Sequence, residues 1–361
     1  MKKVYISIAA LLLCGQMTFA QAPANRTAST VAADVLAQMP AAEQERYNKV
    51  IKELSDSGEG AILELVKMIN APGKGSNASV DYALSGLSNF VMAKGLESDR
   101  LAVSKAYMKA LEMTSERETR AFILRQLQMV GKDECVETIA GYLHDKELGG
   151  PAARVLSAVG SDASGKALVA ALKHRTGTPE SQKSIIMAIA ESKVDGAEEI
   201  LRSMLGSSDP DMQKVVLYAL SQVGTEASLK DLANAAATVG YQMERTGANE
   251  AYIILIKRLA ADASTKVVAE KAANDLMKKA TKANQNHSRE AALQIQLALS
   301  ENPTKLLTKA MKDPSKKYRN AALAFASAHA DNALYIELGK LIPKGNTELK
   351  VDLINWFGRE A

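Results

Sequence analysis

Aromatic residues are scarce in this sequence, because Phe, Trp and Tyr together make up only 4% of its 361 residues. Glycine and proline are also sparse within the apolar stretches, which are rich in Ala, Leu, Ile, Met and Lys. These residues favour helices over strands. The composition argues against a strand-based fold and predicts an all-α protein with many small contacts between its helices.

Neither sign of charge dominates. Lys and Arg total 45 and Asp and Glu total 41, which gives a net charge of +4. Without Lys2 and Lys3, which lie in a segment that we expect to be removed, the net charge is 43 − 41 = +2. Nucleic-acid-binding proteins usually concentrate basic residues on one face. We therefore expect no nucleic-acid partner.

No apolar run is long enough to cross a membrane. The run at residues 4–13 is far shorter than the roughly 20 residues that a transmembrane helix needs. Two lysines precede it, and Thr18-Phe19-Ala20 closes the segment. This order is typical of a secretory signal peptide. It predicts a signal peptide at residues 1–20, cleavage after Ala20, and export to the periplasm or cell surface of a Gram-negative-type bacterium.

Cysteine is limited to Cys14 and Cys135. Removal of the signal peptide would leave Cys135 alone, so an internal disulfide is excluded and the core alone must hold the fold together. Cys14 leaves lipid attachment open as an alternative. However, Leu13 occupies the position where lipid-attachment motifs have a small residue.

The sequence does contain an internal repeat. Residues 156–174, LSAVGSDASGKALVAALKH, return at residues 220–238 as LSQVGTEASLKDLANAAAT, and residues 127–143 and 189–205 fit the same frame. Spacings of three and four between apolar residues predict two amphipathic helices in each unit. The aligned apolar columns are Leu124, Ala153, Ile186, Leu217; Leu127, Leu156, Ile189, Leu220; Ile139, Leu168, Leu201, Leu232; and Leu143, Leu172, Leu205, Ala236.

A short break separates the two helices of each unit. We expect its glycines to end the first helix with positive φ. We also expect an Asp or Thr two positions later to cap the second helix, typically worth about 1 kcal/mol. The glycines are Gly131, Gly160 and Gly224, with Lys193 in the third unit, and the caps are Asp133, Asp162, Asp195 and Thr225.

These columns, the Val-Gly end of the first helix and the Asp that follows it resemble those of HEAT-repeat proteins. A single hairpin cannot bury both of its faces, so such units stack. The resemblance implies an all-α, right-handed α-solenoid of stacked antiparallel helical hairpins over residues 77–361. Residues 21–72 would form a helical cap, an insert would lie near 240–249, and VDLINWFG (351–358) would begin an incomplete last repeat.

Catalytic and metal-binding motifs are not convincing. The segment Gly160–Lys166 approaches a phosphate-binding loop, but Ala167 replaces the hydroxyl residue that holds Mg²⁺, and a helix rather than a strand precedes it. None of the four histidines has a partner at zinc-like spacing. We therefore predict no catalytic residue, no metal and no cofactor in this chain. The histidines are His144, His174, His287 and His329.

Two sets of residues are candidates for binding. The first set stands near the start of successive second helices and alternates in sign, so its members could pair between neighbouring repeats: Glu137, Lys166, Glu199 and Lys230. The second set is Tyr241 and Arg245, which we expect to be exposed on the insert, since loops that interrupt repeats often carry function.

Two functions remain open. The first is an exported, non-catalytic scaffold that binds a protein or peptide on a concave surface formed by the second helices. The alternative rests on a resemblance to the repeat region ahead of a 3-keto-disaccharide hydrolase-type domain. It implies an N-terminal accessory module of a larger carbohydrate-active enzyme, with a covalently following domain.

Overall fold

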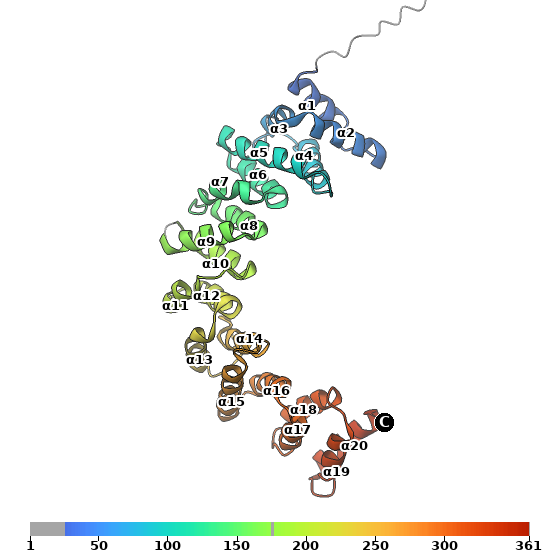
Figure 1. The fold of residues 1–361 in the computed structure, drawn as a ribbon, viewed down its shortest axis with the longest axis vertical. Coiled ribbons are helices and arrows are strands. Elements are labelled where there is room, and N and C mark those ends of the chain that lie inside the picture. The colour runs from blue at the N-terminus through green and yellow to red at the C-terminus, as the bar shows by residue number, and fades with distance from the viewer. Residues whose placement is uncertain (1–25, 175–176, 361) are drawn as a thin grey trace, which may run out of the picture. The chain divides into compact units, whose positions relative to one another are not determined.

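The computed structural model describes residues 26–174 and 177–360, and every regular element in these ranges is a helix (Figure 1). The expected signal peptide lies outside the described residues. The chain divides into two compact units, the first ending at Val130 and the second beginning at Gly131. The prediction of an all-α fold is confirmed.

Residues 26–130, the described part of unit 1, form six helices. Each helix from α1 to α4 packs on the helix two positions further along the chain, so that two layers form. The predicted cap therefore shares one compact unit with α4, α5 and α6. The helices are α1 (Ala28–Ala37), α2 (Gln44–Asp56), α3 (Gly58–Lys67), α4 (Ala78–Phe90), α5 (Glu97–Met113) and α6 (Arg117–Val130).

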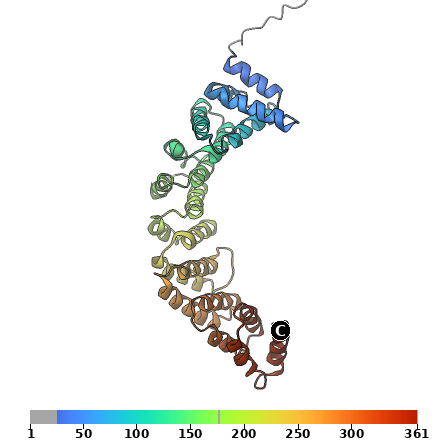
Figure 2. The ribbon, with the colours of Figure 1, turned by 45° about the vertical axis from the view of Figure 1, so that its right-hand side comes forward.

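Unit 2 is a stack of helical hairpins (Figures 1 and 2). The helices are η1 (Asp133–Cys135), α7 (Val136–Ala140), α8 (Gly149–Val159), α9 (Asp162–His174), α10 (Pro179–Glu191), α11 (Glu198–Ser203), α12 (Pro210–Val223), η2 (Glu226–Ser228), α13 (Leu229–Thr238), α14 (Ala248–Ala260), α15 (Lys266–Lys282), α16 (Asn286–Leu299), α17 (Pro303–Ala310), α18 (Lys316–Ser327), α19 (Asn332–Gly339) and α20 (Thr347–Glu360).

The hairpins of unit 2 form two layers. The even-numbered helices from α8 to α18 pack directly against one another, and we call them the first layer. The odd-numbered helices α9, α11 and α13 contact one another less and belong to the second layer. Both views show the two layers side by side along this unit (Figures 1 and 2).

The predicted apolar columns form the core. All members of the column that begins at Leu127, and of the column that begins at Ile139, are 0% exposed. Only Leu205 among the predicted positions is half-buried. The helical period read from the sequence therefore gives the correct buried face in all four repeats.

Helix starts follow local chemistry. Three first turns carry proline, which has no N–H to satisfy there, behind a polar N-cap. Thr178 accepts a hydrogen bond from the Ser181 N–H ahead of α10, and Asp209 accepts one from the Asp211 N–H ahead of α12. Asn302 does the same for the Lys305 N–H in α17.

A side chain on three helices ties the preceding loop to its own helix. Arg120 Nε donates to the Thr114 carbonyl at 2.6 Å, and Gln213 Nε2 donates to the Ser207 carbonyl at 2.7 Å. Arg319 Nη1 donates to the Asp313 carbonyl at 2.9 Å. Each bond spans six residues, so a polar residue in the first or second turn fixes the loop that enters the hairpin.

The breaks within hairpins follow the prediction only in part. Gly160 has φ +61° as expected, and Lys193 adopts a similar φ of +51° without being glycine. Gly224 has φ −64°, so the expected positive φ is wrong there. Glycine is still required at that position, because a Cβ would lie 2.4 Å from the Leu220 carbonyl oxygen.

The predicted N-caps are also correct only in part. Thr225 caps η2 by accepting from the Ala227 N–H at 3.2 Å. The predictions for Asp133 and Asp162 are wrong, because each is already the first residue of its helix. The prediction for Asp195 is wrong too, because Ala197 is the N-cap of α11. Ser161 precedes α9 and supplies its cap instead, since its Oγ accepts from the Ser164 N–H at 3.3 Å.

The last described helix is well anchored. Trp356 on α20 is 0% exposed, and its Nε1 donates to Ser327 Oγ at 3.1 Å. Its ring lies 5.6 Å from the Tyr335 ring and 5.2 Å from the Phe357 ring, measured between centroids. The indole is therefore covered by neighbours on α18, α19 and α20. Val351 and Ile354 on the other side of α20 are 50% and 56% exposed.

Candidate functional site

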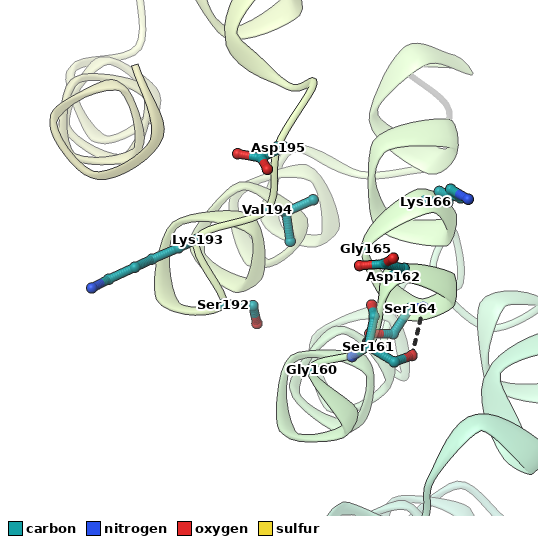
Figure 3. A pocket seen from close by; sticks show the side chains of 10 residues that line it. All are labelled: Gly160, Ser161, Asp162, Ser164, Gly165, Lys166, Ser192, Lys193, Val194 and Asp195. Carbon is teal, nitrogen blue, oxygen red and sulfur yellow. Dashed lines mark hydrogen bonds between the residues drawn. The ribbon is translucent and has the colours of Figure 1, made fainter. Parts of the chain in front are cut away.

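The segment that resembles a phosphate-binding loop is a helix cap (Figure 3). Ser161 and Ser164 bond reciprocally, because the Ser161 N–H donates to Ser164 Oγ at 3.0 Å and the Ser164 N–H donates to Ser161 Oγ at 3.3 Å. These N–H groups are the ones that a bound phosphate would need. The loop's own side chains use them as a helix cap.

Gly165 has a packing role. A Cβ at this position would lie 3.1 Å from Val194 Cγ1 of the next repeat, tighter than ordinary contact. Figure 3 shows Val194 facing the N-terminal part of α9 across a shallow hollow. Gly165, which makes the segment resemble a phosphate-binding loop, therefore permits the close approach of two repeats.

An apolar groove of about 570 Å³ lies across the first-layer helices α10, α12 and α14. Its apolar lining comes from Met187, Val215, Tyr218, Ala251 and Ile254. Tyr218 is 38% exposed and Ile254 is 37% exposed. Large apolar side chains open to solvent in a groove are typical of a contact site for a partner.

Polar groups border this groove. Asp211 Oδ1 accepts from Arg245 Nη2 at 2.7 Å across the loop before α14. Lys183 Nζ lies 3.5 Å from Asp209 Oδ2. Glu250 Oε2 is buried and has no hydrogen-bond partner. The border therefore contains one hydrogen-bond acceptor without a partner, Glu250 Oε2, next to the apolar lining of the groove.

Helical spacing places these residues on one face. Lys183 and Met187 are four apart on α10, and Lys214 and Tyr218 are four apart on α12. Such pairs are neighbours on a helix surface. The apolar columns read from the sequence contain none of these positions, so the groove was not predicted. The available signal was a second apolar stripe on the first helices, where solvent would favour polar residues.

The four residues predicted to form a charged ridge are all exposed near the start of successive second helices: Glu137 on α7, Lys166 on α9, Glu199 on α11 and Lys230 on α13. Within the described part of the chain, no ion pair joins any two of them. Their role in binding stays a prediction.

The contacts that do link these helices involve neighbours of the predicted residues. Arg202 Nε on α11 donates to Asp231 Oδ2 on α13 at 2.6 Å. Glu198 accepts from the Thr225 N–H and from Thr225 Oγ1, both at 2.8 Å, and from Ser228 Oγ. Burial alone would raise the pKa of Glu198, but these hydrogen bonds hold it below its ordinary value. One carboxylate thus caps the second helix of the following repeat.

The insert before α14 behaves differently from the prediction. Arg245 is exposed, as expected, and pairs with Asp211. The expected exposure of Tyr241 is wrong, since this residue is 6% exposed. Gly240 and Tyr241 both have positive φ, and this left-handed turn directs the chain back into the protein. The Tyr241 carbonyl then accepts from Ser288 Oγ on α16 at 2.8 Å.

Among residues 26–174 and 177–360, no group of three or more His, Cys, Asp or Glu side chains could hold a metal ion. No described helix combines the length and the apolar character that a membrane crossing needs.

Comparison with known proteins supports a helical repeat. Residues 166–253 match the family model of HEAT repeats. This range extends from α9 into α14 and holds nearly all of the groove, so the match supports a HEAT-repeat protein where the groove lies. The predicted HEAT-like character is confirmed over this range.

Solved structures with a similar fold include an engineered protein, the N-terminus of TSC2 and a mutant of Kap121p. The engineered protein is 16% identical, with 91% of this chain and 98% of that chain covered and a TM-score of 0.38. The TSC2 N-terminus is 11% identical, with 91% and 98% covered and a TM-score of 0.34. The Kap121p mutant is 13% identical, with 90% of this chain but 41% of that chain covered and a TM-score of 0.47. No curated protein matches the sequence.

Proposed function

We propose that this protein is a non-catalytic scaffold that binds a partner protein through the groove on α10, α12 and α14. The observation that carries the proposal is the exposure of Tyr218 and Ile254 in a groove with an apolar floor. Because HEAT repeats are helical scaffolds that often serve protein interaction, the family match over the same residues supports it.

The chemistry of the groove defines the partner segment. Bulky apolar side chains would fill the floor between Met187, Val215 and Ile254, and their burial would supply most of the binding free energy. A donor beside them, such as an amide or a basic side chain, would bond to Glu250 Oε2, which has no partner in the free protein. An unmatched buried acceptor costs about 1–3 kcal/mol, so such a donor would add to specificity.

Photo-crosslinking tests this function. A photoreactive phenylalanine analogue replaces Ile254 in one variant and Val267 in a control variant, and both are expressed in the cells that produce the protein. Val267 is 78% exposed on α15 and lies outside the groove. We expect a discrete adduct from position 254 that disappears when Tyr218→Asp is added. Equal adducts from both positions, or an adduct that persists in the Tyr218→Asp variant, would refute the proposal that the groove is the binding site.

We also propose that the protein acts outside the cytoplasm. The support is the order of charge, apolar run and small residue in residues 1–20. Intact-mass measurement on protein from the periplasmic and membrane fractions tests this. A chain that begins at Gln21 would agree with cleavage after Ala20, whereas a chain that retains Met1 would contradict export by this route.

A further inference from the structure

A second hollow in unit 2 differs in character from the groove. It has a volume of about 470 Å³ and lies between α15, α16 and α17, with Asp313 and Tyr318 closing one end. One part of its lining is apolar, from Met277, Leu293 and Leu306. The rest of the lining is largely polar and includes three basic side chains, Lys278, Arg289 and Lys309, against one carboxylate, so the hollow could hold a small molecule with a negatively charged end.

The charged end is built around Arg289 of α16. The side chain is 6% exposed, and its Cζ lies 3.9 Å from the centroid of the Tyr318 ring. Nη2 is bound to Asp313 Oδ2, and Nη1 lies 3.3 Å from Asn286 Oδ1. Nε is buried and has no hydrogen-bond partner. A buried guanidinium N–H that lacks an acceptor is costly, and a ligand oxygen would relieve that cost.

Two lysines on different helices add positive charge to the hollow. Lys278 lies on α15 and Lys309 lies on α17, and both are exposed. Among the described residues, neither has an ion pair. The one carboxylate in the lining, Asp313, is already occupied, because Oδ2 binds Arg289 and Oδ1 accepts from the Ser315 N–H at 2.9 Å. The hollow therefore carries an excess of positive charge.

Amides complete the polar wall. Gln296 Nε2 donates to Asn274 Oδ1 at 2.7 Å, and both side chains line the hollow. Tyr318 is fixed by its hydroxyl, which lies 3.7 Å from Met277 Sδ. The walls are thus held by contacts within the protein, and a ligand would meet a preformed site.

We propose that this hollow binds a small organic carboxylate whose apolar body lies against Leu293 and Leu306. The carboxylate accepts from Arg289 Nε, and Lys278 and Lys309 attract it from the rim. This site is separate from the groove on α10, α12 and α14, so either proposal can fail alone.

Calorimetric titration of the full-length chain tests the proposal, with benzoate as the probe and benzamide as its neutral match. Lys278→Gln with Lys309→Gln is the test variant. Lys266→Gln with Lys271→Gln is the control, because it makes the same change of charge on exposed α15 residues outside the hollow. We expect the test variant to weaken benzoate binding about tenfold, and the control to leave it nearly unchanged.

Three results would overturn the proposal. Equal binding of benzoate and benzamide would show that charge is not recognised. Weakening by the same factor in both double variants would show a diffuse electrostatic effect. Binding of inorganic phosphate as tight as that of benzoate would show that the apolar wall contributes nothing. Methyl NMR of Met277, which lines the hollow, shows whether the ligand binds there. The chemical shift of its methyl group should change when benzoate is added and stay unchanged when benzamide is added.

Discussion

Lys193 occupies a backbone conformation that suits glycine, so Lys193→Gly should stabilise the protein. Its φ is +51°, and the equivalent position in the preceding repeat is Gly160, with φ +61°. A side chain in this left-handed region costs about 1–2 kcal/mol. Glycine loses more chain entropy on folding, about 0.5–1 kcal/mol. The difference predicts a gain of about 0.5–1 kcal/mol for Lys193→Gly, and Gly160→Ala should lose a similar amount.

Urea unfolding followed by circular dichroism measures this effect. The gain should appear as a higher midpoint at an unchanged slope in the transition that includes α10 and α11. Lys193→Ala is the matched control, because it removes the charge and the long side chain but keeps a Cβ at positive φ. If Lys193→Ala stabilised the protein as much as Lys193→Gly, backbone strain would not be the cause. A neutral Gly160→Ala would refute the reasoning equally.

Two further predictions concern contacts between repeats. Glu198→Gln should lower stability by about 1 kcal/mol at pH 7, because a neutral amide is a weaker acceptor for Thr225 and Ser228. The folded pKa of Glu198 is lowered, so its contribution is present above the ordinary value of 4.5 and fades as pH falls through the folded pKa. Thermal melts should therefore converge in acid, and a gap that persists there would contradict this. Gly165→Ala should cost about 1 kcal/mol through overpacking, and Val194→Ala should relieve it. Additive costs in the double-mutant cycle would disprove the packing role.

Much of the fold could be predicted from the sequence, because it depends on local periodicity. The positions Leu127, Leu156, Ile189 and Leu220 share one phase of a 3.6-residue period, and all are 0% exposed in the structure. Thr225 was also predictable as a cap, since its side-chain oxygen bonds only two residues away. Such interactions need no information from distant parts of the chain.

Binding surfaces were less predictable. The ridge from Glu137 to Lys230 was placed on the correct helices. However, the ion pair between repeats joins Arg202, three positions after Glu199, to Asp231, one position after Lys230. Side-chain reach across a gap depends on the rotation of each helix about its own axis. The apolar columns fix that rotation only coarsely, so neighbouring positions could not be distinguished.

The sequence by itself determined that this chain forms stacked helical hairpins, and which face of each helix is buried, because both follow from spacings of three and four. Only the tertiary structure decided that Tyr241 turns inward, since Gly240 and Ser288 act on it together. It alone also placed Tyr218 and Ile254 in the lining of one groove, and Lys278 and Lys309 in the lining of one hollow. These residues stand more than 30 positions apart, and only the packing of successive hairpins brings them together.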